Sequence, residues 1–318
     1  MKRLPWKRIA GAVLVAAAVA YLVWTIARSW DQLRAFDWEV DVAMLVASTA
    51  AHVAVLAWGV WVWGRVLRCF AHPPVGNGAL QRIWFLSSLA RYIPGKVFQF
   101  VAVAQLSTAA GLSGAVLLTS LVVHTGMALL SAMLLSAWTL TGPLFPALPP
   151  VAIGVAATVV CILLVHPAFL NAAIGFIPRL LKKNVIRWEG SWIDGVGVLA
   201  LSVASWVLYG GAYYLFLASL TEIPASAIPM LSGVNALSFV IGYVSIVSPA
   251  GAGVREYAMT QLLLPLVPEP VGAVLSIASR LWTIAAELLG GALVLLLTRK
   301  GTASASVDGE AAAVVEAE

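Results

Sequence analysis

Two cations at the centre of an apolar stretch are the first residues in this sequence whose types suggest chemistry. The stretch 84–105, WFLSSLARYIPGKVFQFVAVAQ, carries Arg91, Tyr92 and Lys96 around a Pro-Gly pair. A charge in hydrocarbon costs about 2.5–3.5 kcal/mol by insertion scales, so such residues normally face protein or a water-filled cavity. Because proline and glycine interrupt a continuous helix, the pattern predicts two half-helices that meet at membrane depth.

The second of these half-helices would add backbone donors to the side chains. With Pro94 as its first residue, its free N–H groups and positive dipole end lie beside Lys96 and Arg91. Gln99, three residues after Lys96, shares its face and can donate a further hydrogen bond. Tyr92 either joins the same ligand or sits as an amphipathic ring at an interface. This combination predicts a binding site for an anion.

A second break of the same kind, the run SPAGAGVRE, occurs in the other half of the chain. Its candidate binding residues are Ser248, Gly251, Gly253, Arg255 and Glu256. The serine could cap a half-helix that starts at Pro249, and the glycines would let a ligand or another backbone approach closely. The two breaks therefore predict two halves of one site.

The charged residues at predicted membrane depth are Arg91, Lys96, Arg255, Glu256, Arg280 and Glu287. Positive charges exceed negative ones by two in this set, which indicates a counter-anion and adds Arg280 to the binding residues. The alternative is that the acids form internal ion pairs that fix the packing of the broken helices, for instance Glu256 with Arg280. His52 and His124 each lie alone in a span without a second metal ligand nearby, and fit better as core residues.

Composition places the chain among integral membrane proteins. It is 61% hydrophobic and 10% charged over 318 residues, with a mean hydropathy of +0.96. No nucleotide-binding loop or metal-ligand spacing is present, so we expect no cofactor, no metal and no enzymatic activity in this chain. The net charge of +5 is weak evidence for nucleic acid, which is not expected as a partner. We expect one transmembrane domain over 1–300 and a disordered acidic tail over 301–318.

Loop charges predict the topology. The loops at 65–82 and 179–187 are basic and should be cytoplasmic, whereas the loop 28–41 is acidic and should be external. Two loops on one side must be separated by an even number of crossings, and two unbroken spans already lie between the basic loops. The broken stretch 84–105 therefore makes no net crossing, and the same counting applies to 228–266.

The expected fold is an all-α polytopic membrane protein with six full spans and two re-entrant broken hairpins. The six spans are 9–27, 42–63, 115–140, 151–165, 195–217 and 272–297. The hairpins enter from opposite faces, an inverted arrangement that places a transporter's site near the midplane. Both termini are then cytoplasmic.

Three stretches resemble the signature regions of a known family. They are SLARYIPGKVFQ (88–99), SPAGAGVREYAMTQLLL (248–264) and SRLWTIAAELLGG (279–291), and they resemble the lysylphosphatidylglycerol synthetase transmembrane-domain family, also called flippase-like. The resemblance extends over nearly the whole chain except the acidic tail. The family's patterned residues fall on Arg91, Tyr92, Pro94, Gly95, Lys96, Gln99, Pro249, Gly251, Gly253, Arg255, Glu256 and Arg280.

The resemblance implies a multi-pass protein of the bacterial inner membrane that moves an anionic or modified lipid between leaflets. The aminoacyl-lipid synthetases of the family carry a large soluble catalytic domain, and here only the short tail follows, so synthesis of a lysyl-lipid by this chain alone is not expected. We expect a lipid flippase for a phospholipid or a polyprenyl-phosphate-linked glycolipid, whose phosphate lies between Arg91, Lys96 and Arg255. The alternatives are a membrane-embedded transferase, an accessory subunit of cell-envelope glycan or lipid assembly, or a scaffold. Expected partners are the anionic lipid, further copies of the chain and cell-envelope biosynthesis enzymes.

Overall fold

The structure, a computed structural model, is built of α-helices. It describes residue 24 and residues 27–70, 74–88, 98–109, 111–180, 185–245 and 251–315. In these ranges the helices are α2 (Trp30–Ala35), α3 (Val42–Leu67), α4 (Asn77–Ser88), α5 (Phe98–Ala109), α6 (Gly114–Leu144), α7 (Pro150–Leu164), α8 (Pro167–Leu180), α9 (Trp192–Ala218), the 3-10 turn η2 (Ala225–Ala227), α10 (Ile228–Val244), α11 (Val254–Leu263) and α12 (Glu269–Val315). No strand occurs in them beyond an isolated bridge between Phe70 and Trp188. The predicted all-α class is confirmed.

Side-chain caps mark where the long helices begin. The side chains of Asp41 and Ser113 accept hydrogen bonds from backbone N–H groups in the first turns of α3 and α6. Ser191 and Asp194 form a capping box at the start of α9. Each cap satisfies donors that hydrocarbon would leave unpaired, so the starts of these helices follow the polar residues that precede the apolar runs.

Five helical segments of the described chain are long and apolar enough to cross a membrane. They are α3, α6, α9, η2 with α10, and α12 up to Leu297. The predicted span 151–165 corresponds to α7, whose 15 residues rise only about 22 Å against a hydrocarbon core of about 30 Å. Pro167 starts α8, whose axis is bent by 68° from that of α7. α7 is long enough to cross a membrane only when the first part of α8 is counted with it.

Two parts of the predicted topology stay predictions. The first predicted span, 9–27, lies almost wholly outside the described residues. Although α10 was predicted as half of a hairpin, it is long enough for a span when η2 is included. The described helices therefore provide five candidate spans, or six if α7 and the first part of α8 form one bent span. The structure also continues α12 to Val315, through most of the segment predicted to be disordered, and the disorder of 301–318 in solution remains a prediction.

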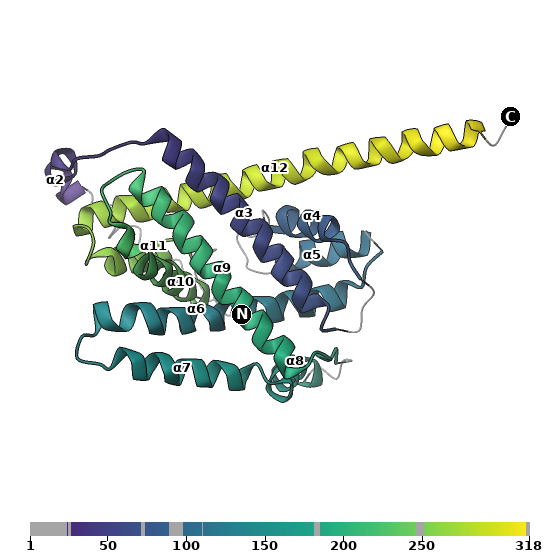
Figure 1. Ribbon diagram of the computed structural model, residues 1–318, viewed down its shortest axis with the longest axis horizontal. Coiled ribbons are helices and arrows are strands. Elements are labelled where there is room, and N and C mark those ends of the chain that lie inside the picture. Colours follow the sequence, from purple (N-terminus) through teal and green to yellow (C-terminus); the bar gives the residue numbers. More distant parts are fainter. Residues whose placement is uncertain are drawn as a thin grey trace, which may run out of the picture.

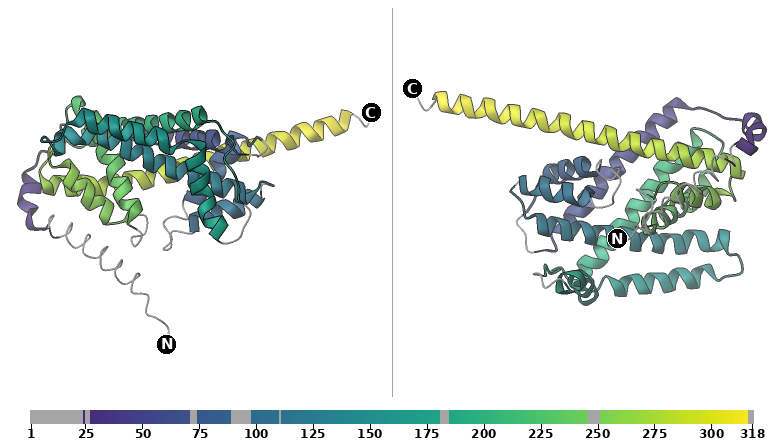
Figure 2. Two further views of the ribbon diagram at one scale, coloured as in Figure 1. Left: turned by 90° about the horizontal axis from the view of Figure 1, so that it is seen from below. Right: turned by 180° about the vertical axis from the view of Figure 1, so that it is seen from behind.

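The centre of the bundle is formed by α3, α6, α9 and α10. α3 packs on α9, and α10 packs on both α6 and α9. The two short helix pairs lie at opposite ends of this bundle: α4 with α5, and α10 with α11 (Figure 1). Both views of Figure 2 keep the pairs apart, while α12 runs past both and contacts α4 and α11. The helices α4 and α5, which flank the first predicted break, thus lie apart from α11, which follows the second.

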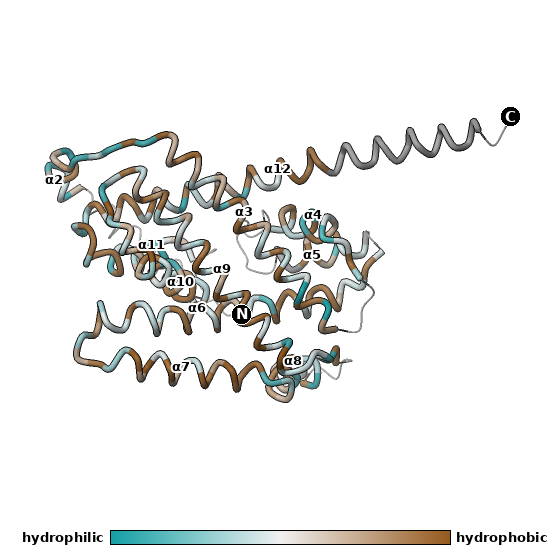
Figure 3. Tube along the Cα trace, in the orientation of Figure 1, coloured by the Kyte–Doolittle hydropathy of each residue, from teal (hydrophilic) through white to brown (hydrophobic). Residues whose placement is uncertain are grey.

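Apolar side chains cover the outside of the bundle. Along α7 the residues Val151, Val155, Val159 and Leu163 are each about half exposed or more, at a spacing of four that forms one continuous face. Figure 3 shows that α7 is apolar along nearly its whole length. An exposed apolar surface of this extent requires lipid rather than water as its solvent.

Loops of like charge meet at the same face of the bundle. Phe70 bridges to Trp188, and the Glu189 N–H donates to the Cys69 carbonyl at 2.8 Å, which joins the two basic loops. At another face, Asp37, Glu222 and Val267 come from three separate loops and line a common cavity. Since the second and third of these loops flank α10 and α11, that segment begins and ends at one face.

Candidate functional site

The break between α10 and α11 is built around two glycines with left-handed backbone. Gly251 has φ +74° and Gly253 has φ +81°, conformations that other L-residues rarely adopt. A Cβ on Gly251 would lie 2.9 Å from the Cα of Gly242 in α10, so the two backbones touch where neither residue has a side chain. The expectation that these glycines permit a close backbone approach is confirmed for Gly251.

The second half-helix starts at Val254, five residues later than the predicted start at Pro249. The Gly253 N–H donates to the Glu256 carboxylate (Oε2) at 2.6 Å, and this carboxylate caps the helix in place of the predicted serine. Ser248 itself lies outside the described residues.

Glu256 is held by two structural contacts at once. Besides capping α11, it accepts a hydrogen bond at Oε1 from the Arg280 guanidinium of α12 at 3.4 Å. The side chains of Arg280 and Glu256 are 17% and 8% exposed. The alternative considered from sequence, that these two residues pair with each other, is confirmed, and their contact with a substrate stays a prediction.

Arg255 has a different environment from its neighbour. Its Nη2 donates to the Asn235 side-chain oxygen at 3.2 Å, and its buried Nε has no hydrogen-bond partner. Tyr209 and Tyr213 lie close enough to interact electrostatically with the guanidinium. Among the residues that the structure describes, no carboxylate lies within ion-pair distance of Arg255. The Arg255 side chain is partly buried, and its unpaired Nε–H donor is available to an anionic ligand.

Aromatic rings form a layer beside this guanidinium. His52 of α3 stacks on Tyr209 with ring centroids 4.5 Å apart and lies 4.3 Å from Trp282 of α12, which in turn stacks on Phe216 at 4.8 Å. His52 Nδ1 and Trp282 Nε1 are buried without a described hydrogen-bond partner, as is the amide nitrogen of Asn235. Unpaired donors and a guanidinium therefore gather between α3, α9, α10 and α12.

Sequence reasoning missed most of this layer. Nothing in the sequence marks Tyr209, Trp282 or Asn235 as neighbours of Arg255. His52 was identified as an intramembrane histidine and interpreted as a satisfied core residue. It is buried, yet its Nδ1 lacks a partner among the described atoms, so that interpretation holds for packing and fails for hydrogen bonding.

The first break lies at the other end of the bundle. Arg91, Tyr92 and Lys96 fall outside the described residues, and Gln99 is described only as part of the helical backbone of α5. Of the two helices that flank this break, α4 packs on α12, where the Phe85 ring fills the space left by Gly290 and would clash with a Cβ there. These four predicted binding residues stay predictions.

The last span connects the two ends. Glu287, one turn before Gly290, is 2% exposed at the level where α12 meets α4, while Arg280 lies two turns earlier and pairs with α11. The two residues share one face of α12, as the spacing of seven predicted. In the described part of the chain, no three His, Cys, Asp or Glu side chains gather as a metal ion would need.

Comparison with known proteins identifies the family of this chain. None of the curated proteins matches the chain. The family model described as "Lysylphosphatidylglycerol synthase TM region" matches residues 8–291, which include both breaks, the aromatic layer and the Glu256–Arg280 pair. The chain thus belongs to the lysylphosphatidylglycerol synthase transmembrane-region family.

Proposed function

We propose that this membrane protein moves a lipid with an anionic headgroup, a phospholipid or a polyprenyl-phosphate-linked glycolipid, between the leaflets without changing it chemically. The observation that carries the proposal is the partly buried Arg255 guanidinium beside a backbone break, which has a free, buried Nε donor and no described carboxylate within ion-pair distance. A guanidinium can bind a phosphate through two parallel hydrogen bonds. This directional geometry suits the phosphate of a lipid headgroup.

The depth of Arg255 supports a lipid rather than a soluble anion. Arg255 lies eight residues before the end of α11 at Leu263, which corresponds to about 12 Å along the helix. With a hydrocarbon core of about 30 Å, this distance from one face places the guanidinium near the midplane. A phosphate there travels with its acyl chains in the surrounding bilayer, and broken helices at this depth are the usual setting of a transport site.

Arg91 and Lys96 would hold the same phosphate from the opposite break, and access would alternate as the two ends of the bundle rock about the central layer. The protein would lie in the bacterial inner membrane with both termini in the cytoplasm. Membership of the lipid-related family and the apolar outer surface support this placement.

The decisive experiment measures exchange of fluorescent lipids in proteoliposomes. Fluorescent phosphatidylglycerol and phosphatidylcholine report the exchange of anionic and zwitterionic headgroups as a reducing quencher removes the outer-leaflet signal. The wild type should exchange the anionic lipid faster, and Arg255→Gln should remove this preference, since a lost charge-assisted hydrogen bond lowers affinity by about ten- to a hundredfold. Arg65→Gln is the matched control, because it removes the same charge from an exposed position.

Three outcomes would contradict the proposal. Arg255→Gln could retain the wild-type rate and preference, which would show that this guanidinium does not contact the headgroup. The wild type could fail to exchange any lipid. Chromatography of the recovered lipids could reveal a new product, which would favour the membrane-embedded transferase instead.

A further inference from the structure

The cavity lined by Asp37, Glu222 and Val267 lies at the end of the bundle where α11 joins α12. It has a volume of about 320 Å³ and is formed by three loops: the one before α3, the one after α9 and the one after α11. From Arg255 to this cavity the chain must run the remaining length of α11, about 12 Å, and then the loop beyond it. The cavity is therefore separate from the proposed phosphate site.

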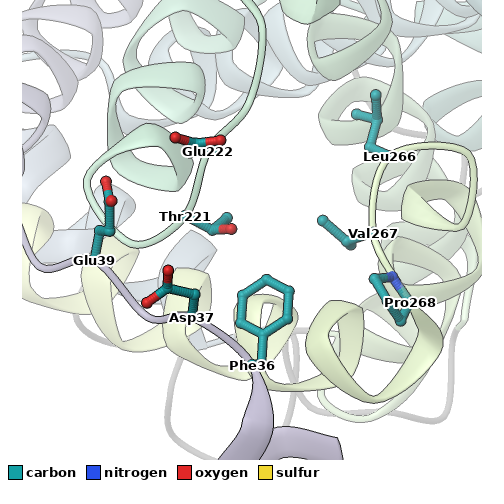
Figure 4. A pocket seen from close by; sticks show the side chains of 8 residues that line it. All are labelled: Phe36, Asp37, Glu39, Thr221, Glu222, Leu266, Val267 and Pro268. Atoms are coloured by element: carbon teal, nitrogen blue, oxygen red, sulfur yellow. The ribbon is translucent and has the colours of Figure 1, made fainter.

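The walls of this cavity differ in character. Carboxylates of Asp37, Glu39 and Glu222 lie along one side, and the apolar side chains of Val267 and Pro268 lie opposite them (Figure 4). The Phe36 ring adjoins the Asp37 carboxylate at one end. In the part of the chain that the structure describes, none of the three carboxylates has a basic group within ion-pair distance. This wall therefore carries three negative charges without a described counter-charge.

Thr221 supplies a second observation that points to a ligand. The residue is only 4% exposed, and its side chain reaches into the space between the acidic and apolar walls (Figure 4). The hydroxyl makes no hydrogen bond to any described residue. The small exposed part of this residue therefore includes the hydroxyl oxygen, which the fold leaves open to the cavity and available to a ligand.

The arrangement excludes a metal ion and favours an organic cation. No three acidic groups of the described chain come close enough together to ligate one metal ion. A cavity of about 320 Å³ would also leave a bare ion far from most of its walls. An ammonium group on a short aliphatic chain matches both sides, because its N–H donors can meet one of the carboxylates and Thr221 while its methylene groups lie on Val267 and Pro268. The Phe36 ring face adds a surface that attracts cations.

We propose that this cavity is a binding site for an aliphatic ammonium group. The group belongs either to a free water-soluble amine or to the amine headgroup of a membrane lipid, since the loops that form the cavity adjoin both water and the ends of the spans. The site does not depend on the proposed lipid exchange, because none of its residues belongs to the Arg255 site.

The test uses the full chain in detergent, with 1-pentylamine as the probe and 1-pentanol as its neutral counterpart. Calorimetry should show saturable binding of the amine and none of the alcohol. Glu222→Gln and Thr221→Val should each weaken amine binding at least tenfold, whereas Glu189→Gln, an exposed acid in the loop before α9, should leave it unchanged. Arg255→Gln should also bind the amine normally, which separates a failure of this inference from a failure of the proposed function.

The source of the ammonium group is distinguished in lipid nanodiscs. If a lipid headgroup is the ligand, discs of phosphatidylethanolamine should compete with pentylamine while discs of phosphatidylglycerol should not. If a free amine is the ligand, both discs should give the affinity seen in detergent. Equal binding of amine and alcohol, unchanged affinity in Glu222→Gln, or displacement of the amine by millimolar calcium would each overturn the inference.

Discussion

Replacing Arg280 with glutamine would remove one partner of the buried ion pair and leave the other in place. The Glu256 carboxylate would keep the Gly253 N–H at 2.6 Å and lose the guanidinium at 3.4 Å. Breaking a buried pair from one side costs about 3–5 kcal/mol of stability, because an uncompensated charge remains. Arg280 retains some solvent contact at 17% exposure, so we expect the lower end, about 3 kcal/mol.

The reverse substitution should cost less. In Glu256→Gln the amide oxygen can still accept the Gly253 hydrogen bond, and the charge left behind is the less buried one, so we expect a loss of about 1–2 kcal/mol. The double variant leaves no charge stranded and should resemble this milder single variant. The two single losses then sum to more than the double loss, with a coupling of about 3 kcal/mol.

Unfolding by SDS titration in mixed micelles measures these free energies on the four proteins of the cycle. Lipid exchange should survive in the double variant if the pair is structural only, because Arg255 keeps its place. Additive losses within about 0.5 kcal/mol would refute the reasoning, since they would show that the two charges do not interact in the folded protein. A single Arg280→Gln loss below about 1 kcal/mol would show that Glu256 is solvated once its partner is gone.

Two further predictions concern packing and topology. Gly210→Ala should destabilise the protein strongly, because its new methyl group would lie 1.8 Å from a serine oxygen of α10, while the adjacent Gly211→Ala, with no atom within 4 Å, should not change the unfolding midpoint. Single cysteines at the exposed positions Gly76 and Glu222 should react with a membrane-impermeant maleimide from opposite sides, with only Glu222→Cys labelled in intact cells. The native Cys69 should give little background at neutral pH, since burial raises the pKa of its thiol to about 11, and labelling of Gly76→Cys in intact cells would contradict the predicted topology.

Hydropathy and loop charge predicted the helices and their grouping because both signals are local. A polar capping residue precedes each apolar run, so the predicted spans 42–63, 115–140 and 195–217 lie within a few residues of α3, α6 and α9. The positive-inside rule also predicted the two basic loops on one side, and the structure joins them through Phe70 and Trp188. α7 was harder, since a bend at Pro167 divides an apolar run whose composition is uniform.

The position of the second break was predicted correctly from the sequence, but the predicted start of its second half-helix was wrong. Proline was taken to start the half-helix, whereas α11 begins where a carboxylate three residues on can reach back to a glycine N–H. The spacing of Gly253 and Glu256 is the capping-box spacing with glycine at the cap, so the signal was present in the sequence. No signal of this kind marks Gly242 in the sequence. A side chain is excluded there only because the backbone of Gly251 packs against it in the fold.

Which arginine pairs with Glu256 could not be read from a count of charges, and packing decides it. Consecutive residues on a helix point about 100° apart, so Arg255 and Glu256 cannot face the same neighbour. Glu256 faces α12 and meets Arg280, which turns Arg255 toward α10. Asn235 and Gly242 lie seven residues apart on one face of α10. The Asn235 side-chain oxygen accepts a hydrogen bond from Arg255, and the absence of a side chain at Gly242 leaves room for the Arg255 stem. The helix that α11 packs against therefore decides which of the two arginines has no carboxylate within ion-pair distance.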